Sequence, residues 1–336
     1  MTVSSSALSM LEWANLSNAP LVKAVTYSLR KAGSIMTDVP FVNSATLLQN
    51  GVRFTGGLPT VDWVKLNAEP TVVKSTAQPY QEQAYIIRNA VDVDKNYVMD
   101  KNQIVDPRGF QAEAVVRSIA YDFNDKFINN DHTVDEDAIV GIKARLDNPT
   151  VYGALAANKI DAGGATASLK PASLTAGTFS KFMEKLDELF WALNAVDGEG
   201  VVLYMNDTVM RRINTGARLA SGAGGFSQAQ DQYGRTVSMY RSAVIRDVGV
   251  KSDQSTRIIL NTETNAGAAG SSTFTSVYGV RYGIDAMFGW QFEPLNVQDL
   301  GLQNNGVTYR TLIDWTGGLM MPDIRAIGRL YDIEIA

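Results

Sequence analysis

Residues 51–98 constrain the fold more than any other segment, because they favour extended structure but have little to pack against. Residues 60–66 (TVDWVKL) and 84–98 (AYIIRNAVDVDKNYV) are rich in β-branched and aromatic residues and alternate in part, which predicts two strands of a long β-hairpin. Residues 67–81 between them are polar and contain two prolines, so we expect an irregular tip. An isolated two-stranded hairpin is only marginally stable in water. The hairpin must therefore rest on its own domain or on a neighbouring chain.

The first 50 residues also lack the means to form a core of their own. Leu11, Leu21 and Val25 belong to a series of apolar residues with roughly helical spacing, which Pro20 interrupts. The segment contains too few large apolar residues to fold independently. Two interpretations remain open: a helix on the surface of its own subunit, or an arm that docks on other chains.

Two long helices are predicted in the middle of the chain. Asp106 is a suitable N-cap and Pro107 a suitable first residue for a helix over 107–130. The apolar stripe of this helix consists of Phe110, Ala114, Val115, Ile119, Phe123 and Phe127. A second stripe with the same periodicity predicts a helix over 175–196.

The second half of the chain is predicted to be rich in strands. A short helix over 207–220 follows a buried strand at 200–206. The other expected strands span 236–248, 257–262, 274–283, 286–295, 309–315 and 325–335. This order lacks the regular alternation of strands and helices of a doubly wound fold, so the predicted fold class is α+β.

The composition excludes many kinds of enzyme site. The chain has no Cys and one His, which rules out disulfides, thiolate nucleophiles, thiolate zinc sites and all-histidine metal cages. The net charge of −5 argues against a dedicated surface for duplex DNA. We see no secretory signal and no apolar run of about 18 residues. The chain is therefore expected to need no cofactor or metal, to bind no membrane, and to be made as a soluble intracellular protein.

Individual residues that could carry chemistry favour structural interpretations. His132 lies among acidic residues without a nucleophile or an orienting partner, so we interpret it as a solvated loop residue. The glycines of residues 222–225 follow a predicted helix and match no phosphate-binding pattern, which indicates a surface loop. Most of the five tryptophans are expected in the core. Trp63 is the exception, because large aromatic residues without a core of their own are typical of interfaces.

The order of these segments resembles the major capsid proteins of tailed bacteriophages, which have the Hong Kong 97-type fold. The resemblance extends over nearly the whole chain and rests on order and local pattern. The segments that carry it are LPTVDWVKLN (58–67), AYIIRNAVDVDKNYV (84–98), the helix at 107–130, DAIVGIKARLDN (137–148) and GLMMPDIRAIGRLYDIEI (318–335). The chain departs from some relatives in lacking a long, charged, helical N-terminal scaffolding extension.

The resemblance implies a division of the chain into five parts. These are an N-terminal arm (1–50), an extended loop (51–98), a peripheral domain (99–200) with the spine helix 107–130 and the helix 175–196, a mainly axial domain (201–310), and C-terminal strands (311–336) that return to the junction of the peripheral and axial domains.

The resemblance also implies a viral structural protein rather than an enzyme. Such a chain assembles in the host cytoplasm into pentamers and hexamers of an icosahedral shell, which becomes the virion capsid around double-stranded DNA. The enclosed DNA is not bound sequence-specifically. Portal and scaffolding proteins are expected partners, and a decoration protein is a further candidate.

Contacts between subunits are expected in the arm and the extended loop, because in the family both reach neighbouring subunits. The expected contact residues are Leu11, Trp13, Leu21, Val25, Trp63, Val72 and Tyr80.

Other functions remain open at this point. An encapsulin-type nanocompartment, which shares the fold and holds cargo proteins instead of a genome, is the nearest alternative. A carboxylate-dependent hydrolase is an alternative of another class, although no pair of nucleophile and base supports it. The two long helices argue against a tail-tube or fibre protein.

Overall fold

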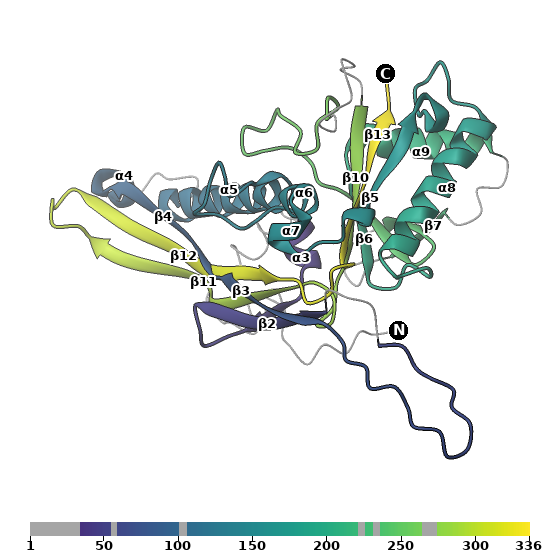
Figure 1. Cartoon of the computed structure of the whole chain (residues 1–336). Helices are drawn as coiled ribbons and strands as arrows, with labels where there is room; N and C mark the ends of the chain where they lie inside the picture. Colours follow the sequence, from purple (N-terminus) through teal and green to yellow (C-terminus); the bar gives the residue numbers. More distant parts are fainter. Residues whose placement is uncertain (1–33, 55–58, 101–105, 221–225, 231–235, 264–273) are drawn as a thin grey trace.

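The computed structural model describes residues 34–54, 59–100, 106–220, 226–230, 236–263 and 274–336. Their strands form three sheets, of four, seven and two strands. The four-stranded sheet and the long helix beside it make one body, and the seven-stranded sheet with two further helices makes another (Figure 1). We call these the four-stranded body and the seven-stranded body. Residues 1–33, which include the predicted arm helix, lie outside the described residues.

The long helix α5 (Pro107–Asn129) begins where the sequence predicts. The carboxylate of Asp106 accepts hydrogen bonds from the backbone N–H groups of Arg108 and Gly109, at 3.1 and 3.3 Å. These bonds satisfy donors that have no partner inside the helix. Its buried side chains are Ala112, Val116, Ile119, Ala120, Phe123, Asn124, Phe127 and Ile128. They turn this face of the helix toward the four-stranded sheet.

The four-stranded sheet has the order β1-β11-β12-β4. Its members are β1 (Phe41–Asn43), β11 (Phe288–Leu302), β12 (Thr308–Met320) and β4 (Tyr85–Asp94). On the face toward α5, Trp315 of β12 packs edge-on against Phe123, with ring centroids 5.8 Å apart. On the opposite face, two ion pairs join β4 to β12, from Arg88 to Asp314 at 2.7 Å and from Arg310 to Asp92 at 2.6 Å. The sheet therefore has an apolar face against the helix and a charged outer face.

The seven-stranded sheet has the order β5-β13-β10-β6-β9-β8-β7. Its members are β5 (Lys159–Gly164), β13 (Ile327–Glu334), β10 (Phe274–Arg281), β6 (Val201–Met205), β9 (Ala243–Asp247), β8 (Thr236–Tyr240) and β7 (Phe226–Gln230). The helices α8 (Ala176–Ala192) and α9 (Asp207–Leu219) pack on it. Phe182 and Leu186 of α8 share one buried cluster with Leu203 of β6 and Leu330 of β13. This cluster is the core of the seven-stranded body.

The two bodies are continuous through a second buried cluster. Phe127 of α5 packs edge-on against Tyr204 of β6, with ring centroids 6.2 Å apart. The other short elements are α3 (Ser34–Asp38), α6 (Ile142–Asp147), α7 (Pro149–Tyr152), two 3-10 turns (Ala156–Asn158, Ala165–Ala167) and α4 (Lys95–Met99). Of these, α4 lies beside the start of α5, at the end of the four-stranded body far from the seven-stranded body (Figure 1).

Two elements pack in another sheet layer than their expected domain ranges suggest, while the division into five parts itself stays a prediction. The helix predicted over 175–196 appears as α8 and packs in the seven-stranded body, not beside the spine helix α5. Conversely, β11 lies within the range expected to be axial but belongs to the four-stranded sheet. The physical reason is that β5 and β13 pair in parallel across about half of the chain, which draws α8 to that sheet. Such long-range pairings leave no local trace in the sequence.

The hairpin expected over 51–98 is present only in part. β2 (Leu48–Phe54) pairs with β3 (Ala77–Gln83), but the chain then continues as β4 and joins β12. Residues 60–66 and 257–262, both predicted as strands, form no strand. Alternation makes a segment suitable for a sheet, but a strand also needs a partner for its backbone groups. Residues 60–66 pair with no strand in the described part of this chain, and in 257–262 only Arg257 pairs, as an isolated bridge to Val250.

Candidate assembly interface

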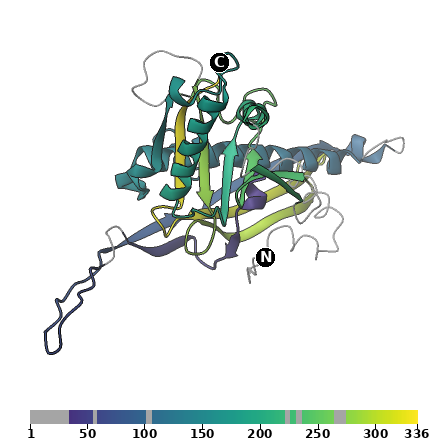
Figure 2. The ribbon, with the colours of Figure 1, turned by 90° about the vertical axis from the view of Figure 1, so that its right-hand side faces the viewer.

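Residues 59–76 form a loop that leaves the body of the molecule and contains neither helix nor strand. Figures 1 and 2 show it as the dark blue segment that projects past all other described elements. The side chain of Trp63 is 100% exposed and that of Val72 is 96% exposed, and Val61 and Leu66 are exposed as well. Large apolar side chains grouped on one projecting segment mark an interaction surface rather than an ordinary monomer surface. This loop is the main candidate for contact with another chain.

The predicted contact residues fall into three groups by their position in the structure. Trp63 and Val72 lie on the projecting loop, free of other side chains, as a contact residue should. Tyr80 lies instead in β3, at the base of the loop, where the guanidinium carbon of Arg53 is 4.0 Å from the centre of its ring. The arm residues Leu11, Trp13, Leu21 and Val25 lie outside the described residues. For all seven, contact with a neighbouring subunit stays a prediction.

The base of the loop is held by a buried ion pair. Arg145 of α6 is 1% exposed and donates to both carboxylate oxygens of Glu82 on β3, at 2.7 and 3.2 Å. Its Nε also donates to the carbonyl oxygen of Val140 at 3.3 Å. Burial acts most strongly, and lowers the pKa of Arg145, but the charge and the hydrogen bonds of Glu82, together with Tyr85 and Tyr80, outweigh it and the pKa is raised. The two parallel bonds fix the hairpin to α6 in one orientation.

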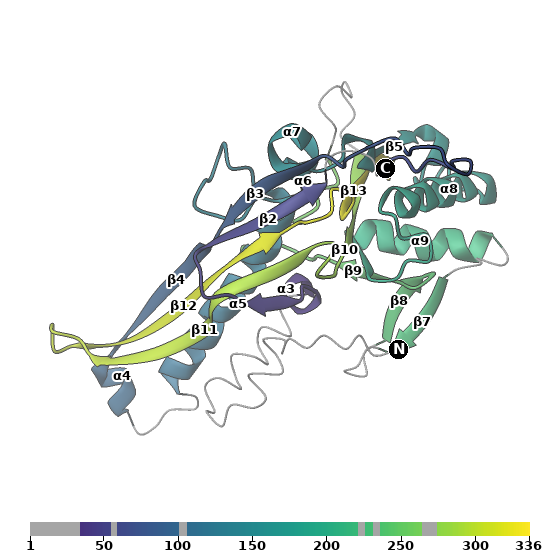
Figure 3. The ribbon, with the colours of Figure 1, turned by 60° about the horizontal axis from the view of Figure 1, so that its bottom comes forward.

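A second arginine ties the hairpin to two other segments. Arg53 of β2 donates to the carbonyl oxygen of Met321 from Nε and Nη2, at 3.3 and 3.1 Å, and to that of Tyr152 from Nη1 at 3.0 Å. Burial raises the pKa of the Tyr80 hydroxyl to about 12, although the positive charge of Arg53 opposes the shift. Figure 3 shows the β2–β3 hairpin lying along the four-stranded sheet. The loop thus projects from a rigid support.

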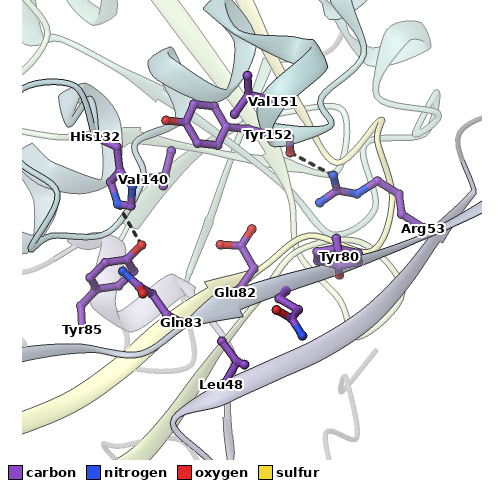
Figure 4. A pocket seen from close by; sticks show the side chains of 11 residues that line it. Leu48, Arg53, Tyr80, Glu82, Gln83, Tyr85, His132, Val140, Val151 and Tyr152 are labelled. Atoms are coloured by element: carbon purple, nitrogen blue, oxygen red, sulfur yellow. Dashed lines mark hydrogen bonds between the residues drawn. The ribbon is translucent and has the colours of Figure 1, made fainter.

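A pocket of about 430 Å³ opens at this support. Its walls come from the hairpin, from the start of β4 and from the segments around His132 and α7 (Figure 4). Tyr80, Tyr85 and Tyr152 give it an aromatic lining, and Glu82 and Arg53 place opposite charges on its walls. The combination of aromatic surface and a few polar groups is typical of pockets that bind a side chain or a small molecule.

His132 lines this pocket, and the expectation of a solvated loop histidine is wrong. The ring is half-buried, and its Nε2 lies 2.8 Å from the hydroxyl of Tyr85 and 2.9 Å from the carbonyl oxygen of Ala138. Tyr85 comes from a strand 47 residues earlier in the chain. No local pattern around His132 could have indicated that contact.

Tryptophans outside the loop divide between core and surface. Trp290 and Trp315 are buried, as predicted. Trp191 is 69% exposed, against the expectation for most tryptophans. The inward face of α8 is taken by Phe182, Leu186, Leu189 and Phe190. Trp191 follows Phe190 directly, and a helix turns by about 100° per residue, so its side chain points away from the core.

The described residues contain no candidate metal site and no candidate membrane-spanning helix. Among them, no group of three or more His, Asp and Glu side chains is arranged to hold a metal ion. None of the helices in the described ranges has both the length and the apolar character needed to cross a membrane. The glycine-rich residues 221–225 lie outside the described part of the chain.

Comparison with known families supports a structural role. Residues 19–174, slightly less than half of the chain, match the family described as Major capsid protein GP7. No curated protein matches the chain.

Solved structures show the fold. The chain is similar to the holo-SrpI encapsulin complex from Synechococcus elongatus PCC 7942, with a TM-score of 0.56, 13% identity, and coverage of 98% of this chain and 96% of that one. The capsid of the native GTA particle gives a TM-score of 0.56, 11% identity, and coverage of 99% and 95%. The capsid of Myoviridae Phage XM1 gives a TM-score of 0.54, 14% identity, and coverage of 88% and 90%.

These findings confirm the predicted resemblance to the major capsid proteins of tailed bacteriophages. The chain has the α+β Hong Kong 97-type capsid fold. The family match and the fold together support a structural, shell-forming capsid protein.

Proposed function

We propose that this chain, with its Hong Kong 97-type capsid fold, is the major capsid protein of a tailed bacteriophage. It self-assembles into an icosahedral shell that encloses double-stranded DNA in the virion. Portal and scaffolding proteins are its expected partners, with a decoration protein as a further candidate, and assembly takes place in the host cytoplasm.

The observation that carries the proposal is the projecting loop 59–76 on its fixed base. Trp63 is fully exposed on this segment, while the buried ion pair of Arg145 and Glu82 holds the β2–β3 hairpin at its base. A lone monomer gains nothing from an apolar loop in water. A shell subunit gains a contact from it, because the loop can bury its apolar side chains on the next copy.

Assembly through many modest contacts fits this architecture. Each contact between copies can be weak, because closure of the shell makes later contacts effectively intramolecular. A net charge of −5 suits a container whose closed wall retains the DNA without a strong grip on it. The described residues form two bodies, and the exposed loop 59–76 is left free to contact another copy of the chain.

Electron microscopy and nuclease protection test the proposal. The full chain is produced with and without its scaffolding partner, and large assemblies are examined by negative stain. We expect closed shells of uniform diameter, and double-stranded DNA that resists nuclease in particles purified from the producing phage. A stable 36.5 kDa monomer under all conditions, including with scaffold, would contradict the proposal.

An encapsulin-type nanocompartment is the second candidate, because the chain is similar to an encapsulin over nearly the whole of both chains. Shells of that kind would contain cargo protein and no genome. Analysis of the contents of purified particles separates the two: nuclease-resistant DNA supports the phage capsid, and a stoichiometric second protein without DNA supports the nanocompartment.

A further inference from the structure

We propose that the pocket at the base of the projecting loop receives Trp63 from a second copy of this chain. The inference rests on the proposed shell function, since it requires copies of the chain to meet. The proposed function identifies the loop as a contact surface. This inference identifies the surface on the next copy that accepts the loop.

The donor is a large aromatic side chain with nothing to cover it. Trp63 is fully exposed, and its neighbours Asp62 and Val64 are exposed too. An indole can bury a large apolar area and carries one N–H group that can only donate. A fitting acceptor therefore has an aromatic lining and at least one hydrogen-bond acceptor.

The pocket meets both requirements. Tyr80, Tyr85 and Tyr152 supply aromatic walls, and the carboxylate of Glu82 and the side-chain oxygens of Gln81 and Gln83 are potential acceptors. Its volume of about 430 Å³ leaves room for an indole. The walls are also fixed before any ligand arrives, because the Arg145–Glu82 pair and the three bonds of Arg53 hold them. Figure 4 shows one of these bonds, from Arg53 to the carbonyl oxygen of Tyr152. Such preorganisation lowers the cost of binding.

The charges complement each other. Arg145 is paired with Glu82, whereas Arg53 donates to the carbonyl oxygens of Met321 and Tyr152 and interacts with the Tyr80 hydroxyl, but forms no salt bridge with any described residue. Arg53 and Arg145 share the single carboxylate of Glu82, so this group of side chains carries one more positive charge than negative charge. Asp62, directly before Trp63, is exposed and forms no ion pair within the described ranges. An indole in the pocket brings that carboxylate toward the buried guanidinium of Arg53, whose positive charge attracts it.

The geometry favours a second copy over the same chain. Trp63 follows the end of β2 by nine residues, a span of up to about 30 Å, and the loop carries it away from the body (Figure 2). Trp63 lies on the projecting loop and the pocket lies at the base of that loop, so each copy can give one side chain and receive one. Contacts of this head-to-tail kind close into rings when the rotation between copies permits.

Another hollow provides a comparison. A groove of about 300 Å³ beside α5 is lined by Phe110, Ser118 and Gln254, among others. Glu113 and Arg117 in its wall form an ion pair with each other. It therefore lacks the unpaired charge that would attract Asp62.

Paired cysteines test the contact, because the chain has no cysteine of its own. Val64→Cys keeps Trp63 in place, and Val151→Cys lies at the exposed rim of the pocket. The matched control combines Val64→Cys with Ser118→Cys beside the α5 groove. We expect mild oxidation of assembled shells to give a ladder of linked chains, roughly tenfold more abundant than in the control, since disulfides need Cα atoms about 4.4–6.8 Å apart.

The outcomes separate this inference from the proposed function. Shells that form normally but show no ladder above the control overturn the docking of Trp63 and leave the shell proposal intact. Failure of the unmodified chain to form any large assembly overturns the shell proposal itself.

A measurement on the unmodified chain covers the case in which the cysteine variants fail to assemble. His132 is the only histidine and lines the pocket, so diethylpyrocarbonate reports on access to it. We expect its acylation to slow roughly tenfold when free subunits assemble, because an inserted indole blocks the approach. Equal rates in free subunits and shells overturn the inference.

Discussion

Arg145 holds a full positive charge where almost no water reaches it, and Glu82 is its counter-charge. Removing one partner of a buried pair leaves the other charge uncompensated, which costs about 3–5 kcal/mol. We therefore expect Arg145→Ala to lower the free energy of unfolding of the unassembled subunit by that amount in urea titration. Lys185→Ala is the control, because the exposed Lys185–Glu188 pair contributes about 0–1 kcal/mol. Equal losses in the two variants would show that the Arg145 pair does not anchor the hairpin.

The same pair shows why single residues of the site escape prediction from sequence. Arg145 and Glu82 are 63 residues apart, and Arg329 and Glu263, a second buried pair with N–O distance 3.0 Å, are 66 apart. Charged residues are expected at the surface unless a partner is known. Only the fold supplies the partner. Trp63 could be identified in advance because its signal was local: a large aromatic residue in a segment without a core.

Alkaline titration probes another residue at the base of the loop. Burial raises the pKa of Tyr80 to about 12, above its ordinary value near 10. A group whose pKa is higher in the folded state contributes stability that is complete below its unfolded pKa and is lost as the pH rises through the folded one. We therefore expect Tyr80→Phe to lose less stability than the unaltered chain between about pH 10 and pH 12, measured as the melting temperature of unassembled subunits. Parallel curves for the two proteins would contradict this.

At the scale of elements, the packing of α9 on α8 depends on a missing side chain. Gly216 lies inside α9, and a Cβ at this position would collide with the ring of Phe179 on α8. Alanine is the better helix former by about 1 kcal/mol, but overpacking costs about 1–3 kcal/mol. We expect the overpacking to prevail, so that Gly216→Ala lowers the free energy of unfolding in urea.

Gly177 near the start of α8 is the matched control. A Cβ there would have Thr175 Oγ1 as its nearest neighbour, at 3.9 Å, so Gly177→Ala meets no obstacle. This variant is expected to be neutral or up to about 1 kcal/mol more stable. A gain in stability in both variants would show that the two helices are not closely packed at Gly216.

Helices and strands could be predicted where the residues that determine them lie within the element itself. The start of α5 follows from Asp106 and Pro107. Ile119, Phe123 and Phe127 of the predicted apolar stripe are buried, whereas Phe110 in the first turn is exposed. The strand at 60–66 failed because its alternation had no partner to pair with, whereas β4 succeeded because β12, more than 200 residues later, lies beside it. The grouping of α8 with the seven-stranded sheet depends on the pairing of β5 with β13. Pairings of that range are properties of the fold and have no signature within either strand.

At the scale of the whole molecule, the two bodies contain the buried core, and the loop 59–76 contains exposed apolar side chains. The two bodies share buried clusters, and Phe127 and Tyr204 join them by direct ring contact. The loop 59–76 contributes nothing to either cluster. Folding of the subunit and association of subunits are therefore expected to depend on different residues.

Shortening the loop tests this separation. Phe54 and Ala77 are paired at the end of the β2–β3 ladder, so replacing residues 59–76 with a short Gly-Ser turn lets the chain close without disturbing either strand. We expect the circular dichroism spectrum and the free energy of unfolding to stay near those of the unaltered subunit, because no buried side chain is removed. Stable shells should not form, because the exposed apolar side chains that bridge copies are gone. Sedimentation of the variant under assembly conditions is the measurement.

Substitutions of Trp63 measure how much this one side chain contributes to assembly. Trp63→Ala should weaken each contact by about 2 kcal/mol if the indole is a hot spot, and so raise the subunit concentration needed for assembly. Trp63→Phe keeps an aromatic ring but loses the N–H donor. The subunit concentration that this variant needs for assembly should lie between those of the unaltered chain and Trp63→Ala. Shells of normal stability from the shortened chain would mean that neighbouring copies hold together through the two bodies alone. The loop would then be an appendage, and the seating of Trp63 in the pocket of a second copy would fail with it.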